Sequence, residues 1–205
     1  MSIYVPFTLL ILTLFVSCKH VPSSVEITEG HQTATNQITK EAAENYNVYN
    51  VVINGAYIRE SGELIIIEDQ TSLPGEVPRI RQLIEGSILK DPATQDILDD
   101  FLTKNAQVHP LGNNFNLNAK YVLISSVDQR QLFQTDNGWT EFNNKYPAAR
   151  GILSLSQVGY NRERNLALVC IGYQSGMLSG GGDFVLLAKE NGDWVIKRKV
   201  TAWAI

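Results

Sequence analysis

Hydrophobic and polar residues follow three successive patterns along this chain. An uncharged, mostly apolar run extends from Ile3 to Val16 and ends beside Cys18. A polar stretch without a sustained hydrophobic period covers residues 19 to 38. From Thr39 onward, apolar residues recur at spacings that are typical of helices and strands. The pattern therefore predicts an N-terminal apolar segment, a polar linker and one folded body.

The first half of the body shows mainly helical spacing. Apolar residues at intervals of three and four predict a helix from Thr39, whose side chain can cap the first turn, to the region of Ile58. The other expected elements of this half are a strand at 64–67, a proline- and glycine-rich loop at 74–78, a helix at 80–88, a helix opened by Asp91-Pro92 and continuing to Leu102, a polar loop at 113–118, a strand at 121–127 and a short amphipathic segment at 139–146.

Closely spaced β runs replace the helical pattern after Gly151. The expected strands are 152–160, 166–173, 184–189 and 194–203. Asn191-Gly192 predicts a two-residue hairpin, because both residues adopt positive φ at low cost. That turn pairs Glu190 with Asp193 and Leu187 with Ile196. The core face expected from this register consists of Val185, Leu187, Trp194, Ile196 and Val200. The predicted class is α+β, with N-terminal helices on a mainly antiparallel C-terminal sheet of about four to six strands.

The first eighteen residues are typical of a bacterial lipoprotein export signal. Its apolar core is shorter than the roughly 20 residues that a membrane-spanning helix needs. Cys18 stands where a lipoprotein signal peptidase would leave an acylated cysteine, carrying groups such as palmitate, as the new first residue. We therefore expect a signal peptide at 1–17, a lipid-anchored flexible tether at 18–38 and a single domain at 39–205. Because no Lys or Arg precedes the apolar core, an ordinary cleaved signal and a short uncleaved anchor remain alternatives.

Charge and composition narrow the range of partners and cofactors. The formal net charge is −4, without the basic excess that nucleic-acid binding requires. Two of the three histidines, His20 and His31, fall in the tether, which leaves only His109 in the body. Cys170 lies in an apolar run and is expected to be an inert core residue. We expect no metal site and no cofactor.

No residue pattern specifies a catalytic mechanism. A hydrolase would have to use His109 as its base, yet the chain has no Gly-x-Ser-x-Gly motif around a nucleophile. Glu68-Asp69, Asp128 and Glu141 could supply paired carboxylates, but the linear sequence does not place them at the separation of about 5–10 Å that glycoside hydrolysis would need. Solvated surface positions are the expectation for these side chains.

The segment from Gln174 to Asp183 predicts a long, mobile hairpin connection, because it contains four glycines. A phosphate-binding loop would need a following helix, whereas the next residues begin a strand at Phe184. Loops that a rigid sheet presents often carry recognition. The candidate recognition residues are Gln174, Ser175, Gly176, Met177, Leu178, Ser179 and Asp183.

The C-terminal part of the chain resembles a known group of proteins. The residues that carry the resemblance are Trp139–Phe142, Tyr146-Pro147, Gly151–Asn161, Asn191–Ile196 and Trp203. They are similar to the C-terminal half of a family of uncharacterised bacterial envelope lipoproteins. The resemblance implies an envelope location and brings no known activity. That family carries two cysteines where this chain has Ser175 and Ser179, which implies that the loop disulfide is absent here and the loop looser. The order of elements is also similar to the nuclear-transport-factor-2-like fold.

Three hypotheses for function follow. The leading one is a non-enzymatic interaction module, attached to the membrane through a lipid on Cys18, which binds an envelope protein or a small ligand. The alternative is a small hydrolase or isomerase with a pocket between helices and sheet, using His109, Asp128 or Glu141 as acid or base. A purely structural spacer is the third.

Overall fold

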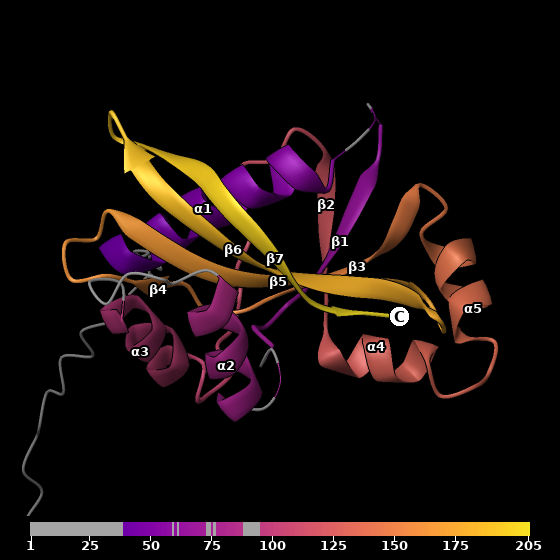
Figure 1. The fold of residues 1–205 in the computed structure, drawn as a ribbon. Coiled ribbons are helices and arrows are strands. Elements are labelled where there is room, and N and C mark those ends of the chain that lie inside the picture. Colours follow the sequence, from indigo (N-terminus) through magenta and orange to yellow (C-terminus); the bar gives the residue numbers. More distant parts are fainter. Residues whose placement is uncertain (1–38, 59, 61, 73–74, 76, 88–94) are drawn as a thin grey trace, which may run out of the picture. The chain divides into compact units, whose positions relative to one another are not determined.

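A seven-stranded mixed sheet forms the centre of the fold (Figure 1). The computed structural model describes residues 39–58, 60, 62–72, 75, 77–87 and 95–205. The strands run in the order β2-β1-β3-β5-β6-β7, and β4 pairs with β5. β1 is parallel to both β2 and β3, and the other pairs are antiparallel. The strand bounds are β1 Leu64–Glu68, β2 Lys120–Ile124, β3 Ala149–Leu155, β4 Gly159–Tyr160, β5 Leu166–Gly176, β6 Ser179–Glu190 and β7 Asp193–Ala204.

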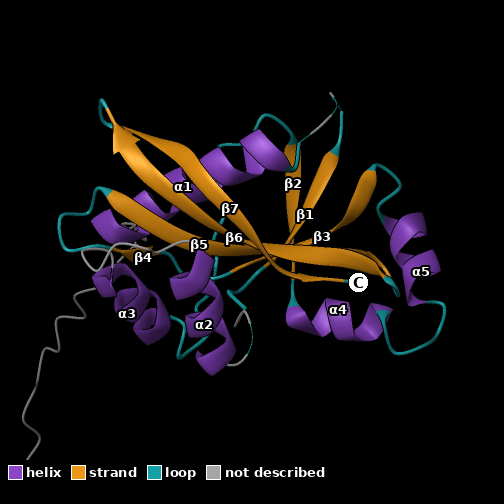
Figure 2. Cartoon of the chain, viewed as in Figure 1, coloured by secondary structure: helices purple, strands orange, loops and turns teal. Residues whose placement is uncertain are grey.

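The helices cover the two faces of the sheet unequally (Figures 1 and 2). The helix bounds are α1 Lys40–Ala56, α2 Val77–Ser87, α3 Gln95–Lys104, α4 Ser126–Leu132 and α5 Gly138–Lys145. α1 packs on one face, here named the α1 face, and contributes to the largest buried cluster. On the opposite face, the second face, α2 and α3 pack over β5 and β6, while α4 and α5 pack over β1 and β3. The second face therefore has two separate helical pairs and two separate cores.

α1 forms as the sequence predicts. The Thr39 side chain accepts a hydrogen bond from the Ala42 backbone N–H and so satisfies a donor that the first turn leaves free. Tyr49 is buried and donates its hydroxyl hydrogen to the Ser156 carbonyl. Burial raises the pKa of Tyr49 far above its ordinary value, so this phenol remains a donor. The helix thus has a capped start and a buried polar contact to the chain that follows β3.

The Asn191-Gly192 hairpin between β6 and β7 is also confirmed. Both turn residues have positive φ, and Glu190 pairs with Asp193 as expected. Leu187 pairs with Ile196, and both belong to the core on the α1 face.

The prediction for Val200 is wrong. The register shifts between Leu186 and Leu187, where β7 contains one extra residue. A one-residue shift moves every later side chain to the other face. Val200 therefore pairs with Phe184 and packs in the core under α2 and α3, instead of sharing the α1 face with Val185.

The α+β class is confirmed, but the sheet differs from the prediction. It has more strands than expected, and the parallel β2-β1-β3 part was not foreseen. The expected strand at 152–160 is two strands, β3 and the short β4. Val127 belongs to α4, which the sequence analysis missed, and Pro78 lies in the first turn of α2 instead of a loop. The expectations for residues 1–38, Ile88 and Asp91-Pro92 lie outside the described residues.

Candidate functional site

The predicted recognition segment is a tight hairpin. β5 continues to Gly176 and β6 starts at Ser179, so the turn contains only Met177 and Leu178. The prediction of a long glycine-rich connection is therefore wrong, because Gly180, Gly181 and Gly182 are strand residues.

Two serines close this hairpin. The Oγ atoms of Ser175 and Ser179 lie 2.9 Å apart and share a hydrogen bond across the two strands. The two side chains therefore join the strands directly, at the positions where the resemblance implied an absent disulfide.

Trp203 packs against three glycines of β5 and β6. A Cβ atom on Gly182 would lie 2.3 Å from the Trp203 Nε1 atom, and one on Gly172 would lie 3.4 Å from its six-membered ring. A Cβ on Gly180 would lie 3.3 Å from the same ring. Gly172, Gly182 and Trp203 are also cross-strand neighbours on β5, β6 and β7. The indole thus lies across three glycines on the second face, and a side chain at Gly182 would displace it.

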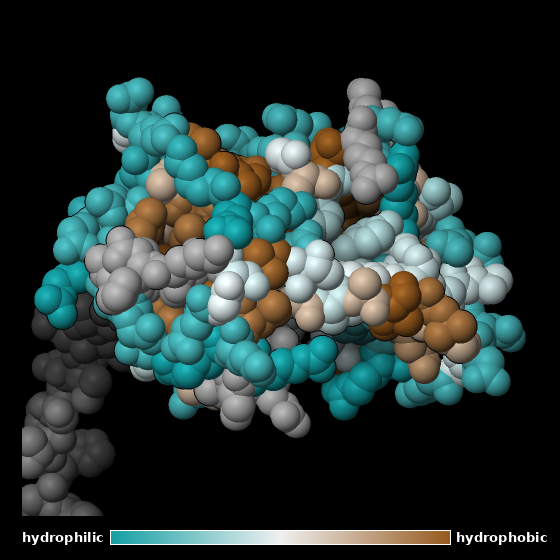
Figure 3. Space-filling view, viewed as in Figure 1, coloured by the Kyte–Doolittle hydropathy of each residue, from teal (hydrophilic) through white to brown (hydrophobic). Residues whose placement is uncertain are grey.

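The tip of the hairpin exposes large apolar side chains. Met177 is 66% exposed and Leu178 is 80% exposed. Ile205, which is 60% exposed, is held beside the same hairpin because its backbone N–H donates to the Gly180 carbonyl, 3.0 Å away. Figure 3 shows hydrophobic side chains gathered over this end of the hairpin, beside α4 and α5. An exposed apolar group of this kind is typical of an interaction surface.

A groove of about 680 Å³ lies between the hairpin and the α4–α5 connection. Gln174 and Met177 line it from the hairpin, and the rings of Phe133 and Trp139, with centroids 4.8 Å apart, line it from the helices. The polar residues that line the same groove are Gln129, Arg130, Gln134, Thr135 and Asp136. Protein-binding surfaces commonly combine aromatic residues with polar ones, as this lining does.

A second groove lies on the same face between Trp203 and α2. It consists of two cavities of about 350 Å³ each, which share Gly75 and Trp203. One is lined by small polar residues, including Ser72 and Ser154, and the other by apolar residues, including Leu83. Ligand cavities commonly have volumes of about 300–1,000 Å³, so each is large enough for a small molecule.

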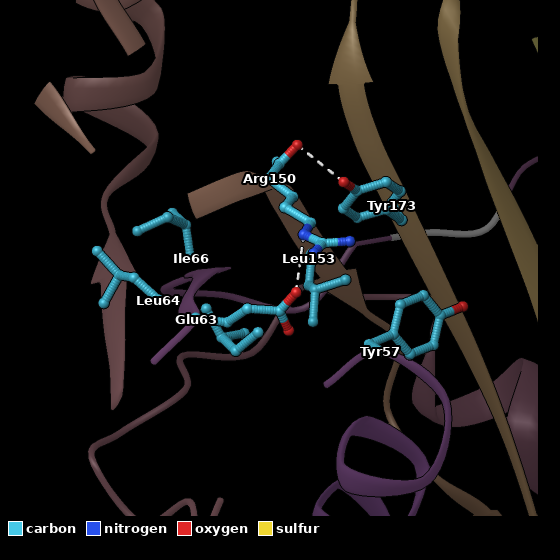
Figure 4. Close-up of a pocket in the computed structure, with 9 residues that line it drawn as sticks. Tyr57, Glu63, Leu64, Ile66, Arg150, Leu153 and Tyr173 are labelled. Carbon is cyan, nitrogen blue, oxygen red and sulfur yellow. Dashed lines mark hydrogen bonds and ion pairs between the residues drawn. The ribbon is translucent and has the colours of Figure 1, made fainter. Parts of the chain in front are cut away.

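A third cavity, shown in Figure 4, lies where β1 and β3 begin. Arg150 extends toward Glu63, and its Nε atom lies 2.7 Å from a Glu63 carboxylate oxygen. Its Nη2 atom lies 2.8 Å from Glu60. The Tyr173 hydroxyl donates to the Arg150 carbonyl at 2.8 Å. Hydrogen bonding to Glu60 and the charge of Glu63 raise the pKa of Arg150 above its ordinary value.

The size of this third cavity indicates a structural role. Its volume is about 160 Å³, below the usual range for ligand sites. Glu63 is only 8% exposed, so its charge must be compensated, and Arg150 supplies that compensation. The interaction connects the start of β3 to the start of β1, a long-range contact that the sequence analysis did not identify.

The residues proposed for acid–base chemistry are not brought together in a pocket. His109 is half-buried, and its backbone N–H donates to the Thr71 hydroxyl. Asp128 is exposed at the start of α4, where it accepts from the Ser125 hydroxyl at 2.7 Å, and Glu141 is exposed on α5. The side chains of His109, Asp128 and Glu141 line none of the cavities described above.

The remaining candidates have structural surroundings. Glu68 accepts a hydrogen bond from Gln129, and burial raises the pKa of its carboxyl above the ordinary value. Asp183, the last residue of the predicted recognition segment, lies away from the tip and pairs with Lys199 at 3.1 Å. Cys170 is buried, as expected, and burial raises the pKa of its thiol to about 12. A thiol with such a pKa is a poor nucleophile at neutral pH.

Comparisons with known proteins give no further assignment. Within the described ranges, no helix is long and apolar enough to cross a membrane. The same residues contain no group of three or more His, Cys, Asp or Glu side chains suited to a metal ion. No family model, curated protein or solved structure matches this chain.

Proposed function

We propose that this protein is a non-enzymatic interaction module of the bacterial envelope, and that the β5–β6 hairpin recognises a partner protein. The observation that carries the proposal is the exposure of Met177 and Leu178 at the end of a hairpin closed by the Ser175–Ser179 hydrogen bond. The adjacent groove, lined by Gln174 and Met177, extends the same surface.

Burial of apolar side chains and preorganisation of the hairpin both favour binding at this surface. A large apolar side chain that moves from water into a partner's surface contributes about 1.5–3 kcal/mol when it is fully buried. The hairpin holds Met177 and Leu178 in place before binding, which reduces the conformational entropy lost on association. Two such side chains beside an aromatic-lined groove can therefore serve as the anchor of an interface.

The proposed partner is a protein with a complementary apolar surface. The polar residues around the groove would form the rim of the contact, while Phe133 and Trp139 would lie near its centre. The enzymatic alternative has no comparable support, because His109, Asp128 and Glu141 line none of the described cavities.

The membrane attachment is a separate part of the proposal. Its support is the apolar run that ends beside Cys18 and the polar residues 19–38 that follow it. A flexible tether of that length has a root-mean-square span of about 25 Å. Cys18→Ala is expected to move the full chain from the membrane fraction to the soluble fraction, and mass spectrometry of the mature N-terminus would identify the acyl groups. An unchanged distribution, with an unmodified cysteine, would contradict lipid anchoring.

The hairpin assignment is tested by chemical crosslinking of the full chain in cells of its source organism, followed by affinity isolation. We expect discrete adducts with the unmodified sequence, and loss of those adducts with Met177→Ser and Leu178→Ser combined. Val108→Ser is the matched control, because Val108 is 54% exposed and lies on the connection between α3 and β2. Equal loss in both variants, or in neither, would remove the assignment to the hairpin.

A further inference from the structure

The groove between Trp203 and α2 combines a hydroxyl group with a half-buried aromatic ring. Four residues cross the sheet in one row, Ser154 on β3, Gly172 on β5, Gly182 on β6 and Trp203 on β7. The row places a hydroxyl at one end and an indole at the other, with two residues between them that lack side chains. The Ser154 Oγ atom lies 2.5 Å from the position of a Cβ on Gly172, so the hydroxyl reaches over the glycine toward the indole.

From this row we propose that the groove binds one neutral sugar ring, which stacks on the Trp203 indole and places its hydroxyl groups near Ser154 and Ser72. This site is separate from the partner surface at the hairpin tip, since the two grooves have no lining residue in common.

The indole provides a platform. Its inner side lies against Gly172, Gly180 and Gly182, while the side chain as a whole is only half-buried. Among the described residues, no aromatic ring or cation stacks on it. The face of an aromatic ring is electron-rich and attracts the weakly positive hydrogens on the apolar side of a sugar ring. Within the described ranges, the outer side of Trp203 is therefore open to such stacking.

The groove also supplies unused hydrogen-bonding groups. Within the described part of the chain, the hydroxyls of Ser154 and Ser72 and the Trp203 indole N–H have no hydrogen-bond partner. Ser156, by contrast, uses its hydroxyl both to accept from the Cys170 N–H and to donate to the Gln157 carbonyl. A polyhydroxylated ring would satisfy the three unused groups, whereas a hydrocarbon chain would bury them without partners, which is unfavourable because their hydrogen bonds to water would be lost.

The walls disfavour other ligand classes. Arg79 is the one charged side chain that lines the two cavities among the described residues, and it is exposed, so the described walls present no cluster of positive charge to an anion. β3, β5 and β6 are internal strands of the sheet, so an extended peptide could pair only with the outer edge of β7. A neutral ring with one apolar side and a polar rim fits what remains.

The test uses the full chain labelled with 5-fluorotryptophan. The three tryptophans give three ¹⁹F signals, and Trp203→Phe identifies the one that belongs to Trp203. The probes are methyl β-glucoside, N-acetylglucosamine and maltose, each titrated through the millimolar range. We expect at least one of them to shift the Trp203 signal saturably, while the signals of Trp139 and Trp194 stay in place.

Two variants test whether the shift of the Trp203 signal depends on the row of residues that crosses the sheet. Gly182→Ala should abolish the saturable shift, because the new Cβ would lie 2.3 Å from Nε1 and displace the indole. Gly176→Ala is the matched control on the same hairpin, since its Cβ meets no atom closer than 3.4 Å and the shift should persist. Ser154→Ala, which leaves the platform unchanged, should weaken binding by about three- to tenfold through the lost hydrogen bond.

The outcomes decide between ligand classes. The proposal is overturned if no neutral sugar shifts the Trp203 signal, if all three tryptophan signals shift together, or if Gly182→Ala responds like the unmodified chain. Inorganic phosphate and a proline-rich peptide are included as competing probes, because extended proline-rich segments also dock on aromatic surfaces. A saturable shift with either of these, and with none of the sugars, would assign the groove to that other class.

Discussion

The two hairpins of the C-terminal sheet differ in the residues that form their turns. The β6–β7 turn consists of Asn191 and Gly192, both with positive φ and both exposed and polar. The β5–β6 turn consists of Met177 and Leu178, neither of which has positive φ, and both of which expose apolar side chains to water. The first turn has the residues that stabilise a two-residue hairpin, and the second does not.

The surroundings of the two turns differ in the same way. Near the β6–β7 turn, Glu44 of α1 accepts hydrogen bonds from Trp194 at 2.8 Å and pairs with Lys189 at 2.5 Å. The β5–β6 turn lies beside an open groove, and its strands carry glycines that accommodate Trp203. Local departures from stabilising sequence rules occur most often at functional sites. The contrast therefore favours the β5–β6 end as the part of the sheet that binds other molecules.

The largest effect on stability is expected for Gly182→Ala. The added methyl group would overlap Trp203 and should lower the free energy of unfolding by about 1–3 kcal/mol. Urea denaturation measures this change, with Gly176→Ala as the control that should stay close to the parent. If both variants unfold like the parent, Trp203 does not lie across the glycines.

Joining the β5–β6 hairpin covalently should stabilise it. The Ser175 and Ser179 Oγ atoms are 2.9 Å apart, so cysteines at both positions are expected to form a disulfide under oxidising conditions. A loop this short stabilises the fold by about 2 kcal/mol in the chain-entropy description. Mass spectrometry and melting with and without reductant check both points, and persistent free thiols would show that the two strands are further apart here.

Glu44→Gln should weaken the contact between α1 and the β6–β7 hairpin. Burial opposes the ionised carboxylate, but hydrogen bonds from Lys189 and Trp194 outweigh it and keep the pKa of Glu44 below its ordinary value of 4.5. Because the folded pKa is the lower one, this contribution is present above pH 4.5 and disappears as pH falls through the folded pKa.

Glu44→Gln is expected to be less stable than the parent at pH 7, because it loses the charge-assisted hydrogen bonds from Lys189 and Trp194, and the variant and parent should converge in acid. Denaturation curves at several pH values measure this difference. Glu190→Gln serves as the control, because Glu190 pairs with Lys197 on the surface of the same hairpin and should matter little. A loss for Glu44→Gln that does not depend on pH would contradict the ionic origin of the effect.

The smallest effect on stability is expected for Met177→Asn combined with Leu178→Gly, which gives the β5–β6 turn the residues of the other hairpin. Both side chains are exposed, so the free energy of unfolding should change by less than about 0.5 kcal/mol. The proposed partner contact should nevertheless be lost. Unchanged crosslinking with this double variant would mean that the turn residues do not recognise the partner.

The comparison also shows which features the sequence could predict. The Thr39 cap and the Asn191-Gly192 turn depend on neighbouring residues, and both were predicted correctly. The parallel pairing of β1 with β2 and β3 joins segments far apart in the chain, and nothing local specifies it. α4 was missed because Tyr121–Val127 resembles one continuous strand, although Ser125 caps the helix that starts at Ser126.

The glycines of the candidate site show why register limits such prediction. Gly180 and Gly182 alternate along one strand, a spacing that could have indicated a strand face kept free for a large side chain. Two register shifts between β6 and β7 then place Trp203, rather than Thr201, opposite Gly182. The Asn191-Gly192 turn alone implies that Thr201 pairs with Gly182. The position of Trp203 across the glycines is therefore evident only from the three-dimensional structure.

The central claim is that the β5–β6 turn, and not the β6–β7 turn, contacts a partner. The most direct measurement places a photoreactive amino acid at position 178 in one full-length chain and at position 191 in another, and compares the crosslinked products after irradiation of intact cells. Our account predicts a discrete protein adduct from position 178 and none from position 191. Adducts of equal yield from both positions, or from position 191 alone, would contradict it.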